Sequence, residues 1–164
     1  MQERGPVAAL VTRPRALAVT AAAAAPIVLL DQLTKWWALE ALSDGPTHLF
    51  WTLDLRLTFN SGAAFSTGPG LTPFLTAAGV VLVGMLVLMS RSATMPGAAV
   101  ALGVLLGGAV GNLSDRLFRD HGGAVIDFVD FGWWPVFNVA DSALVCGAIL
   151  LVLVTARAER ATSP

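Results

Sequence analysis

Four long apolar stretches, separated by short polar segments, dominate the pattern of this chain. They cover residues 16–39, 71–90, 97–117 and 139–156. Each is about as long as the roughly 20 mostly apolar residues that a helix needs to cross a bilayer. The gaps between them leave no room for a soluble domain. The pattern therefore predicts an all-α membrane protein, a four-transmembrane-helix bundle that forms one membrane-embedded domain over residues 16–156.

The two ends of the chain are more polar and carry arginines, so we expect a cytoplasmic N-terminal extension (1–15) and a cytoplasmic tail (157–164). Lysine and arginine concentrate on the cytoplasmic side of membrane proteins. The side of the termini would hold Arg4, Arg13, Arg15, Arg91, Arg157 and Arg160, against Lys35, Arg56, Arg116 and Arg119 on the other side. A cleavable signal peptide is the alternative for the first stretch. Its apolar run continues past the alanines to Leu30, which favours a retained helix.

A shorter pattern of a different kind lies between the first two apolar stretches. The segment "LDLRLTF", residues 53–59, alternates apolar and polar side chains, which is typical of a half-buried β-strand. The "NSGAAF" segment that follows, residues 60–65, is expected to form a turn. We therefore expect a little β-structure on the extracytoplasmic surface of the membrane.

The composition supports a membrane protein and removes several function classes. Hydrophobic residues make up 55% of the 164 residues and charged residues only 13%, whereas soluble domains have about 25% charged residues. The net charge of −1 indicates no basic face for nucleic acid. The single cysteine, Cys146, cannot form an internal disulfide and belongs to no metal or redox motif.

Polar residues that are rare in membrane helices converge on one predicted level, near the extracytoplasmic helix ends. Such residues usually face a bundle interior or a watery cavity. Helical spacing places Asp31 and Lys35 on one face, because they are four residues apart. Snorkelling or helix capping explains any one of these residues, but not the whole set. The set comprises Asp31 and Lys35 in the first helix, Asn60 in the outer loop, Asn112, Asp115 and Arg116 at the end of the third helix, Asp127 in the next loop, and Asn138 and Asp141 at the start of the fourth.

The residue types in this set favour hydrolysis by paired carboxylates. The sequence has no serine–histidine–aspartate arrangement, no HExxH and no paired cysteine–histidine spacing, so we expect neither a metal nor a cofactor. Two aspartates held close together share one proton. One can then activate water while the other protonates, which hydrolyses a peptide without a covalent intermediate. The candidates are Asp31, Asp115, Asp127 and Asp141.

A small membrane transporter or proton relay is the alternative function, since intramembrane acids also mark ion pathways. A transporter would distribute polar residues through the depth of the membrane and often contains internal repeats. This sequence keeps its polar groups in one predicted layer and shows no internal repeat, which favours a peptidase.

Five short motifs, in order and spacing, resemble the sequence blocks of lipoprotein signal peptidase (signal peptidase II). They are "DQLTK" (31–35), "NSGAAF" (60–65), "GGAVGNLSDR" (107–116), "GAVIDF" (123–128) and "FNVADS" (137–142). Each motif alone is weak, but five in order across four predicted spans are highly specific.

The resemblance implies an aspartyl endopeptidase of the bacterial inner membrane. Such an enzyme removes the signal peptide from diacylglyceryl-modified prolipoproteins, just before the lipidated cysteine. The resemblance also implies both termini in the cytoplasm, an active site near the extracytoplasmic face, a small extracytoplasmic β-sheet or cradle and a short surface helix. The implied partners are prolipoprotein substrates, membrane lipid and globomycin-type peptide inhibitors, and no cofactor is implied.

The motifs also imply a role for each polar position. The catalytic pair would be Asp127 and Asp141, and which of them acts as base and which as acid stays open. Asn60, Gly108, Asn112, Arg116 and Asn138 match positions that line the site or hold substrate. Asp31 and Lys35 would stabilise the polar cluster, and Asp115 would pair with a nearby cation.

Overall fold

A bundle of four long helices forms most of the protein in the computed structural model, which describes residues 12–62 and 71–162. The helices are α1 (Arg13–Ala41), α2 (Leu71–Ser92), α3 (Pro96–Phe118) and α4 (Val139–Thr162). All four are long and apolar enough to cross a membrane, as the hydropathy pattern predicts. The chain is therefore a multi-pass membrane protein.

The bounds of the elements differ from the predicted ones in a few places. Helix α4 continues from the predicted end at Ala156 to Thr162, because the added turns contain the strong helix formers alanine, arginine and glutamate. Within the described ranges no short helix accompanies the four long ones. The predicted N-terminal extension falls mostly on residues 1–11, and the end of the "NSGAAF" motif on residues 63–65, outside the described residues.

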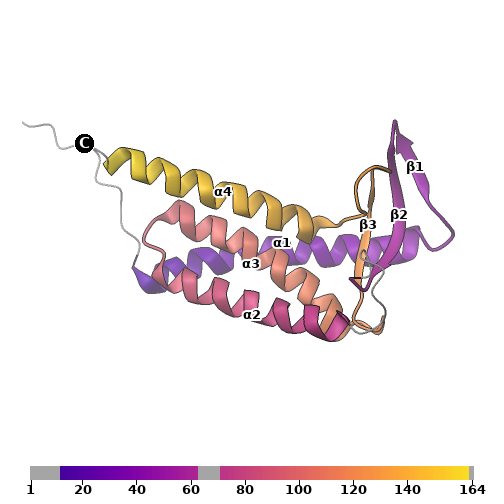
Figure 1. The fold of residues 1–164 in the computed structure, drawn as a ribbon, viewed down its shortest axis with the longest axis horizontal. Coiled ribbons are helices and arrows are strands. Elements are labelled where there is room, and N and C mark those ends of the chain that lie inside the picture. The colour runs from indigo at the N-terminus through magenta and orange to yellow at the C-terminus, as the bar shows by residue number, and fades with distance from the viewer. Residues whose placement is uncertain (1–11, 63–70, 163–164) are drawn as a thin grey trace, which may run out of the picture.

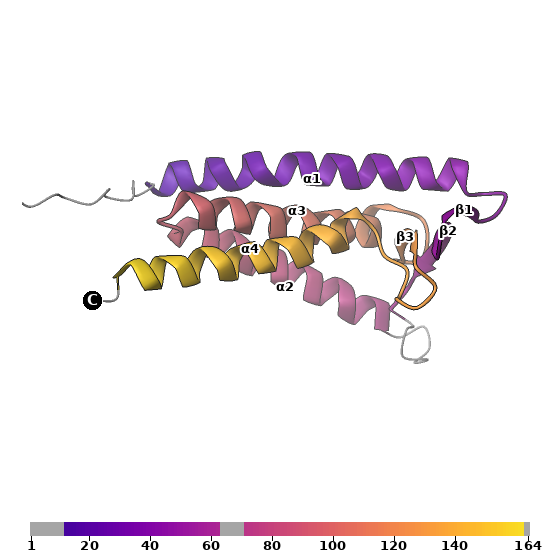
Figure 2. The same cartoon turned by 90° about the horizontal axis from the view of Figure 1, so that it is seen from above.

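Helix α3 lies at the centre of the bundle and packs against α1, α2 and α4 (Figure 2). Its glycines allow the close approach to α1. A Cβ atom on Gly103 would lie 2.5 Å from the Thr20 carbonyl oxygen, and one on Gly107 would lie 2.7 Å from the Cβ of Ile27. Small residues let membrane helices pack closely. This glycine stripe therefore joins helices within the chain.

A three-stranded antiparallel sheet lies across one end of the bundle (Figure 1). Its order is β1 (Thr47–Phe50), β2 (Leu53–Asn60) and β3 (Val125–Asp130). Strand β2 confirms the strand predicted over residues 53–59. The placement of Asp127 in a loop was wrong, because Asp127 lies within β3. This strand has apolar residues on both faces and is buried on both, so it lacks the alternation by which a half-buried strand is detected.

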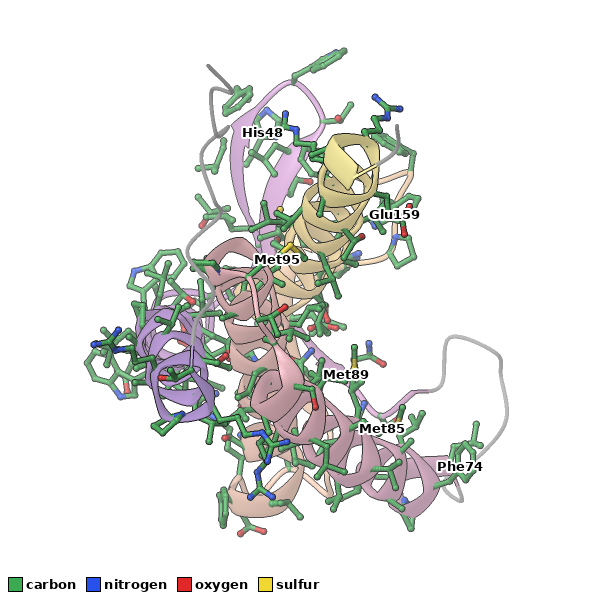
Figure 3. All side chains as sticks on the ribbon, turned by 90° about the vertical axis from the view of Figure 1, so that its left-hand side faces the viewer. His48, Phe74, Met85, Met89, Met95 and Glu159 are labelled. Atoms are coloured by element: carbon green, nitrogen blue, oxygen red, sulfur yellow. The ribbon has the colours of Figure 1, made fainter. Side chains whose placement is uncertain are left out.

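The opposite end of the bundle holds the start of α1 and the end of α4 (Figures 1 and 2). Between the two ends, the outer surface of the helices is apolar. Phe74, Met85 and Met89 of α2 are exposed and stand on the outside of the bundle (Figure 3). Exposed apolar side chains of this kind suit a protein whose surroundings are lipid.

Candidate active site

The pairing of β2 with β3 brings Asn60 beside Asp127. Thr58 lies opposite Asp127 and Asn60 lies opposite Val125, so Asn60 and Asp127 are diagonal neighbours on the sheet. The Asn60 Nδ2 donates to Asp127 Oδ2 at 2.9 Å. The backbone N–H of Gly62 donates to Asn60 Oδ1 at 2.9 Å. This bond fixes the orientation of the amide, so that its nitrogen faces Asp127.

The start of α4 places Asp141 through a capping box. The Asp141 backbone N–H donates to Asn138 Oδ1 at 2.9 Å, and the Asn138 backbone N–H donates to Asp141 Oδ2 at 3.2 Å. These reciprocal bonds satisfy N–H groups that the first turn of a helix leaves without a partner. Helix capping is the alternative explanation that the sequence offers for Asn138 and Asp141. The structure shows that they do cap α4, and these bonds fix both side chains at the helix end.

One hydrogen-bond network joins the two aspartates. The Asn138 Nδ2 donates to Asp127 Oδ1 at 2.7 Å and to Asn112 Oδ1 at 3.0 Å. The Asn112 Nδ2 donates to Asp141 Oδ1 at 2.7 Å. Residues from α3, β3 and α4 thus meet at one point, although they are far apart in the sequence. All four oxygens of the two carboxyl groups accept a hydrogen bond from an N–H group.

Burial determines the protonation of Asp127, whose side chain is almost fully buried. Burial raises the pKa of Asp127 to about 6, and the nearby charge of Asp141 acts in the same direction. The hydrogen bonds from Asn60 and Asn138 and the charge of Lys35 oppose this rise of the pKa. When a buried carboxyl group lies next to a second acid, it can keep its proton close to neutral pH, and such groups are typical of catalytic sites.

A second layer of charged side chains lies beside the asparagines, and its members Asp31, Lys35 and Asp115 are fully buried. Lys35 pairs with Asp31 at 2.9 Å and with Asp115 at 2.8 Å, and it donates to Asn112 Oδ1 at 3.0 Å. Arg119 pairs with Asp115 at 3.0 Å. Two acids and two bases balance one another, which a buried cluster of charges requires.

The structure brings together most of the residues that the sequence singled out. Arg116 is different, because its guanidinium donates to the Gly123 carbonyl oxygen at 3.0 Å and makes no ion pair with either candidate catalytic aspartate in the described part of the chain. Gly108 lies where α4 crosses α3, since a Cβ there would lie 2.5 Å from the Ala140 carbonyl oxygen.

Two further residues of the network were missed by sequence reasoning. The Gln32 Nε2 donates to both Asp31 and Asp115 at 3.1 Å, and Arg119 donates to Gln32 Oε1 at 3.1 Å. The signals were present in the sequence. Gln32 lies inside the "DQLTK" motif, and Arg119 follows Asp115 by four residues, the spacing of an ion pair on one helix face.

A hollow opens beside each of the two aspartates. The hollow at Asp141 measures about 320 Å³ and is mostly apolar, with Trp134, Phe137 and Val145 in its wall. The hollow at Asp127 measures about 250 Å³ and is lined by Asn60, Ser61 and Pro135 among others. The site therefore offers one mostly apolar hollow and one more polar hollow, each next to a carboxyl group.

Comparison with known proteins agrees with this arrangement. The family model of signal peptidase II matches residues 23–157. The lipoprotein signal peptidase of Rhodococcus jostii is 49% identical over 134 residues, which cover 79% of this chain and 68% of the relative. The enzyme of the same name from Mycobacterium avium is 46% identical over 147 residues, which cover 87% of this chain and 81% of the relative.

A solved bacterial membrane enzyme has the same fold. It superimposes with a TM-score of 0.75 at 29% sequence identity, over 84% of this chain and 92% of the enzyme. With a matching family model over most of its length, two close relatives and this structural neighbour, the chain belongs to the signal peptidase II family.

Proposed function

We propose that this protein removes the signal peptide from diacylglyceryl-modified prolipoproteins and that Asp127 and Asp141 are its catalytic pair. The observation that carries the proposal is the network in which Asn138 and Asn112 hold the two carboxyl groups at one point. Carboxyl groups that share a proton can hydrolyse a peptide bond with water as the nucleophile.

The proposed chemistry uses the two protonation states of the pair. The ionised carboxylate takes a proton from a water molecule that attacks the scissile carbonyl carbon. The protonated partner gives its proton to the carbonyl oxygen, which forms a tetrahedral diol. When the diol breaks down, the carboxyl group that took the proton from water gives it to the departing amine, and the partner takes back a proton from a diol hydroxyl. Burial raises the pKa of Asp127 to about 6, so this carboxyl group can carry a proton below that pH. The asparagine side chains keep both carboxyl groups oriented throughout.

The two hollows support a lipid-modified substrate. The apolar hollow beside Asp141 suits the hydrocarbon next to the cut, and the hollow beside Asp127 suits the polypeptide. A globomycin-type peptide would compete with the substrate in the same two hollows, and membrane lipid would surround the apolar helix surfaces.

We further propose that the protein lies in the bacterial cytoplasmic (inner) membrane as one domain over residues 16–156, with both termini in the cytoplasm. The start of α1 and the end of α4 lie at the same end of the bundle. The sheet, in which β3 carries Asp127, and the start of α4, which carries Asp141, lie at the other end. The site would then face the extracytoplasmic side, where prolipoproteins emerge with their lipid anchor.

The test is a cleavage assay in detergent with one prolipoprotein, prepared with and without its diacylglyceryl group. We expect wild type to cut only the lipidated form, and Asp127→Asn and Asp141→Asn to lose cleavage while remaining folded. Asp44→Asn is the matched control, because Asp44 is exposed after α1 and should leave cleavage unchanged. Near-normal turnover by either dyad variant would remove that residue from the mechanism, and failure of folded wild type to cut would refute the function.

A further inference from the structure

Lys35 lies at the centre of the buried charged layer and has no role in the chemistry described so far. Its side chain has 0% exposure. An ammonium group has three N–H donors, and its three acceptors are Asp31 Oδ2, Asp115 Oδ2 and Asn112 Oδ1, at 2.9, 2.8 and 3.0 Å. Every donor of this buried cation therefore has one acceptor, each on a different residue.

Two of these acceptors hold the backbone next to a catalytic aspartate. The Ala140 N–H donates to Asp31 Oδ1 at 2.9 Å, and Ala140 directly precedes Asp141. The Ile126 N–H donates to Asp115 Oδ2 at 3.1 Å, and Ile126 directly precedes Asp127. Because Lys35 bridges Asp31 and Asp115, one cation ties the strand that carries Asp127 to the helix that carries Asp141.

The third acceptor, Asn112, connects Lys35 to the Asp141 side chain. The Asn112 amide can present either its oxygen or its nitrogen to Asp141, and only the nitrogen stabilises a carboxylate there. The other donor to Asn112 Oδ1 is Asn138 Nδ2, whose two hydrogens are divided among Asn112, Asp127 and the Ile126 carbonyl, with the shortest bond to Asp127. One N–H group of Lys35 donates to Asn112 Oδ1 alone, whereas the Asn138 amide divides its hydrogens among three acceptors. Lys35 therefore fixes the orientation of the Asn112 amide.

We propose that Lys35 is a positioning residue that sets the separation of Asp127 and Asp141 and the orientation of the Asn112 amide. It acts through Asp31, Asp115 and Asn112 and does not touch the substrate. This inference rests on the proposed function, since it concerns the same pair of aspartates.

The decisive variant removes the ammonium without leaving an unbalanced buried charge. Lys35→Met alone leaves Asp31 without its cation and can prevent folding. The double variant Asp31→Asn/Lys35→Met keeps the remaining Asp115–Arg119 pair neutral, and the new asparagine retains an oxygen for the Ala140 N–H. The matched control is Arg56→Gln, which removes a half-exposed cation from a different ion pair, with Asp130, and leaves all three Lys35 contacts in place.

For the folded double variant we expect kcat to fall by about 100-fold with little change in KM, because a displacement of about 1 Å at catalytic groups has this effect on rate. Arg56→Gln should keep a kcat close to that of wild type. A double variant with wild-type kcat would overturn the proposal. Folding is checked by thermal melting of each purified variant in the same detergent.

A double-mutant cycle separates positioning from general loss of structure. Asn112→Ala is combined with Lys35→Met in the Asp31→Asn background. Because Lys35 acts partly through Asn112, the combined loss of kcat should be clearly smaller than the product of the two single losses. Losses that simply multiply would refute the link through Asn112.

The pH profile gives a further readout that a purely structural role would not change. The charged groups that interact with the pair are Asp31 and Lys35 on α1 and Arg116 on α3. The charge of Lys35 lowers the pKa of Asp127, so its removal should move the alkaline limb of kcat/KM to higher pH. An unmoved limb in the folded variant counts against Lys35. Absence of cleavage by wild type would refute the proposed function instead, so the two failures are distinguishable.

Discussion

The raised pKa of Asp127 predicts that this residue destabilises the folded protein as the pH rises. An ordinary aspartate in the unfolded chain has a pKa of 3.8, and burial raises the pKa of Asp127 in the folded protein to about 6. The folded state therefore binds more protons than the unfolded state between these values. The contribution of Asp127 to stability is fully present below pH 3.8 and is lost as the pH rises through about 6.

The size of the effect follows from the difference of about two pKa units. One unit corresponds to 1.36 kcal/mol, so ionisation of Asp127 lowers the free energy of unfolding by up to about 3 kcal/mol at high pH. Asp127→Asn removes the titration. The new amide also places an N–H group against Asn60 or Asn138, but that cost is the same at every pH. The stability difference between wild type and variant should thus change with pH by about 3 kcal/mol.

The assay is the free energy of unfolding in mixed detergent–SDS micelles, followed by tryptophan fluorescence between pH 4 and pH 8. Wild type should lose stability relative to Asp127→Asn as the pH rises, with the steepest change between the pKa values of 3.8 and about 6 and little further change above them. The free energy of unfolding of Asp44→Asn, a change at an exposed position, should vary with pH in parallel with that of wild type. Parallel curves for wild type and Asp127→Asn would refute the argument that burial keeps Asp127 protonated.

Two further predictions concern residues that contact the dyad or the helix that carries it. Asn60→Ala removes a hydrogen bond that lowers the pKa of Asp127, so the alkaline limb of kcat/KM should move to higher pH; a limb that stays in place would contradict this role. Gly108→Ala would place a Cβ 2.5 Å from the Ala140 carbonyl oxygen and should destabilise the protein by about 1–3 kcal/mol in thermal or SDS unfolding. Gly84→Ala, where nothing lies within 4 Å, is its control and should not lower stability.

The helices and one strand could be predicted because each leaves a regular pattern in the sequence. A helix in lipid must be mostly apolar over its full length. The predicted ends of α2 and α3 therefore lie within two residues of the observed ends. Strand β2 alternates because Leu55 and Leu57, on one of its faces, pack against a buried core cluster. Strand β3 has no such alternation, since both its faces are covered, and Asp127 interrupts its apolar run.

The candidate site could be predicted in part. The Asp31–Lys35 pair follows from helical spacing alone, because its geometry is local. The bond from the Ala140 N–H to Asp31 joins residues 109 positions apart, and it depends on how closely α1, α3 and α4 approach. No local pattern encodes that distance. The position of Arg116 was also not predictable in detail, since its partner is the Gly123 carbonyl in a turn.

The two ion pairs within single helices have a consequence for how the chain enters the membrane. Asp31 with Lys35, and Asp115 with Arg119, are each four residues apart on one helix. A lone charge at the centre of an inserting helix costs about 2.5–3.5 kcal/mol. Each of the two aspartates has a counter-ion on its own segment, so neither Asp31 nor Asp115 has to enter the membrane as a lone negative charge before α1 and α3 meet. The cross-link from Lys35 to Asp115 then forms only at assembly, and the catalytic layer is completed by helices that were already compatible with lipid.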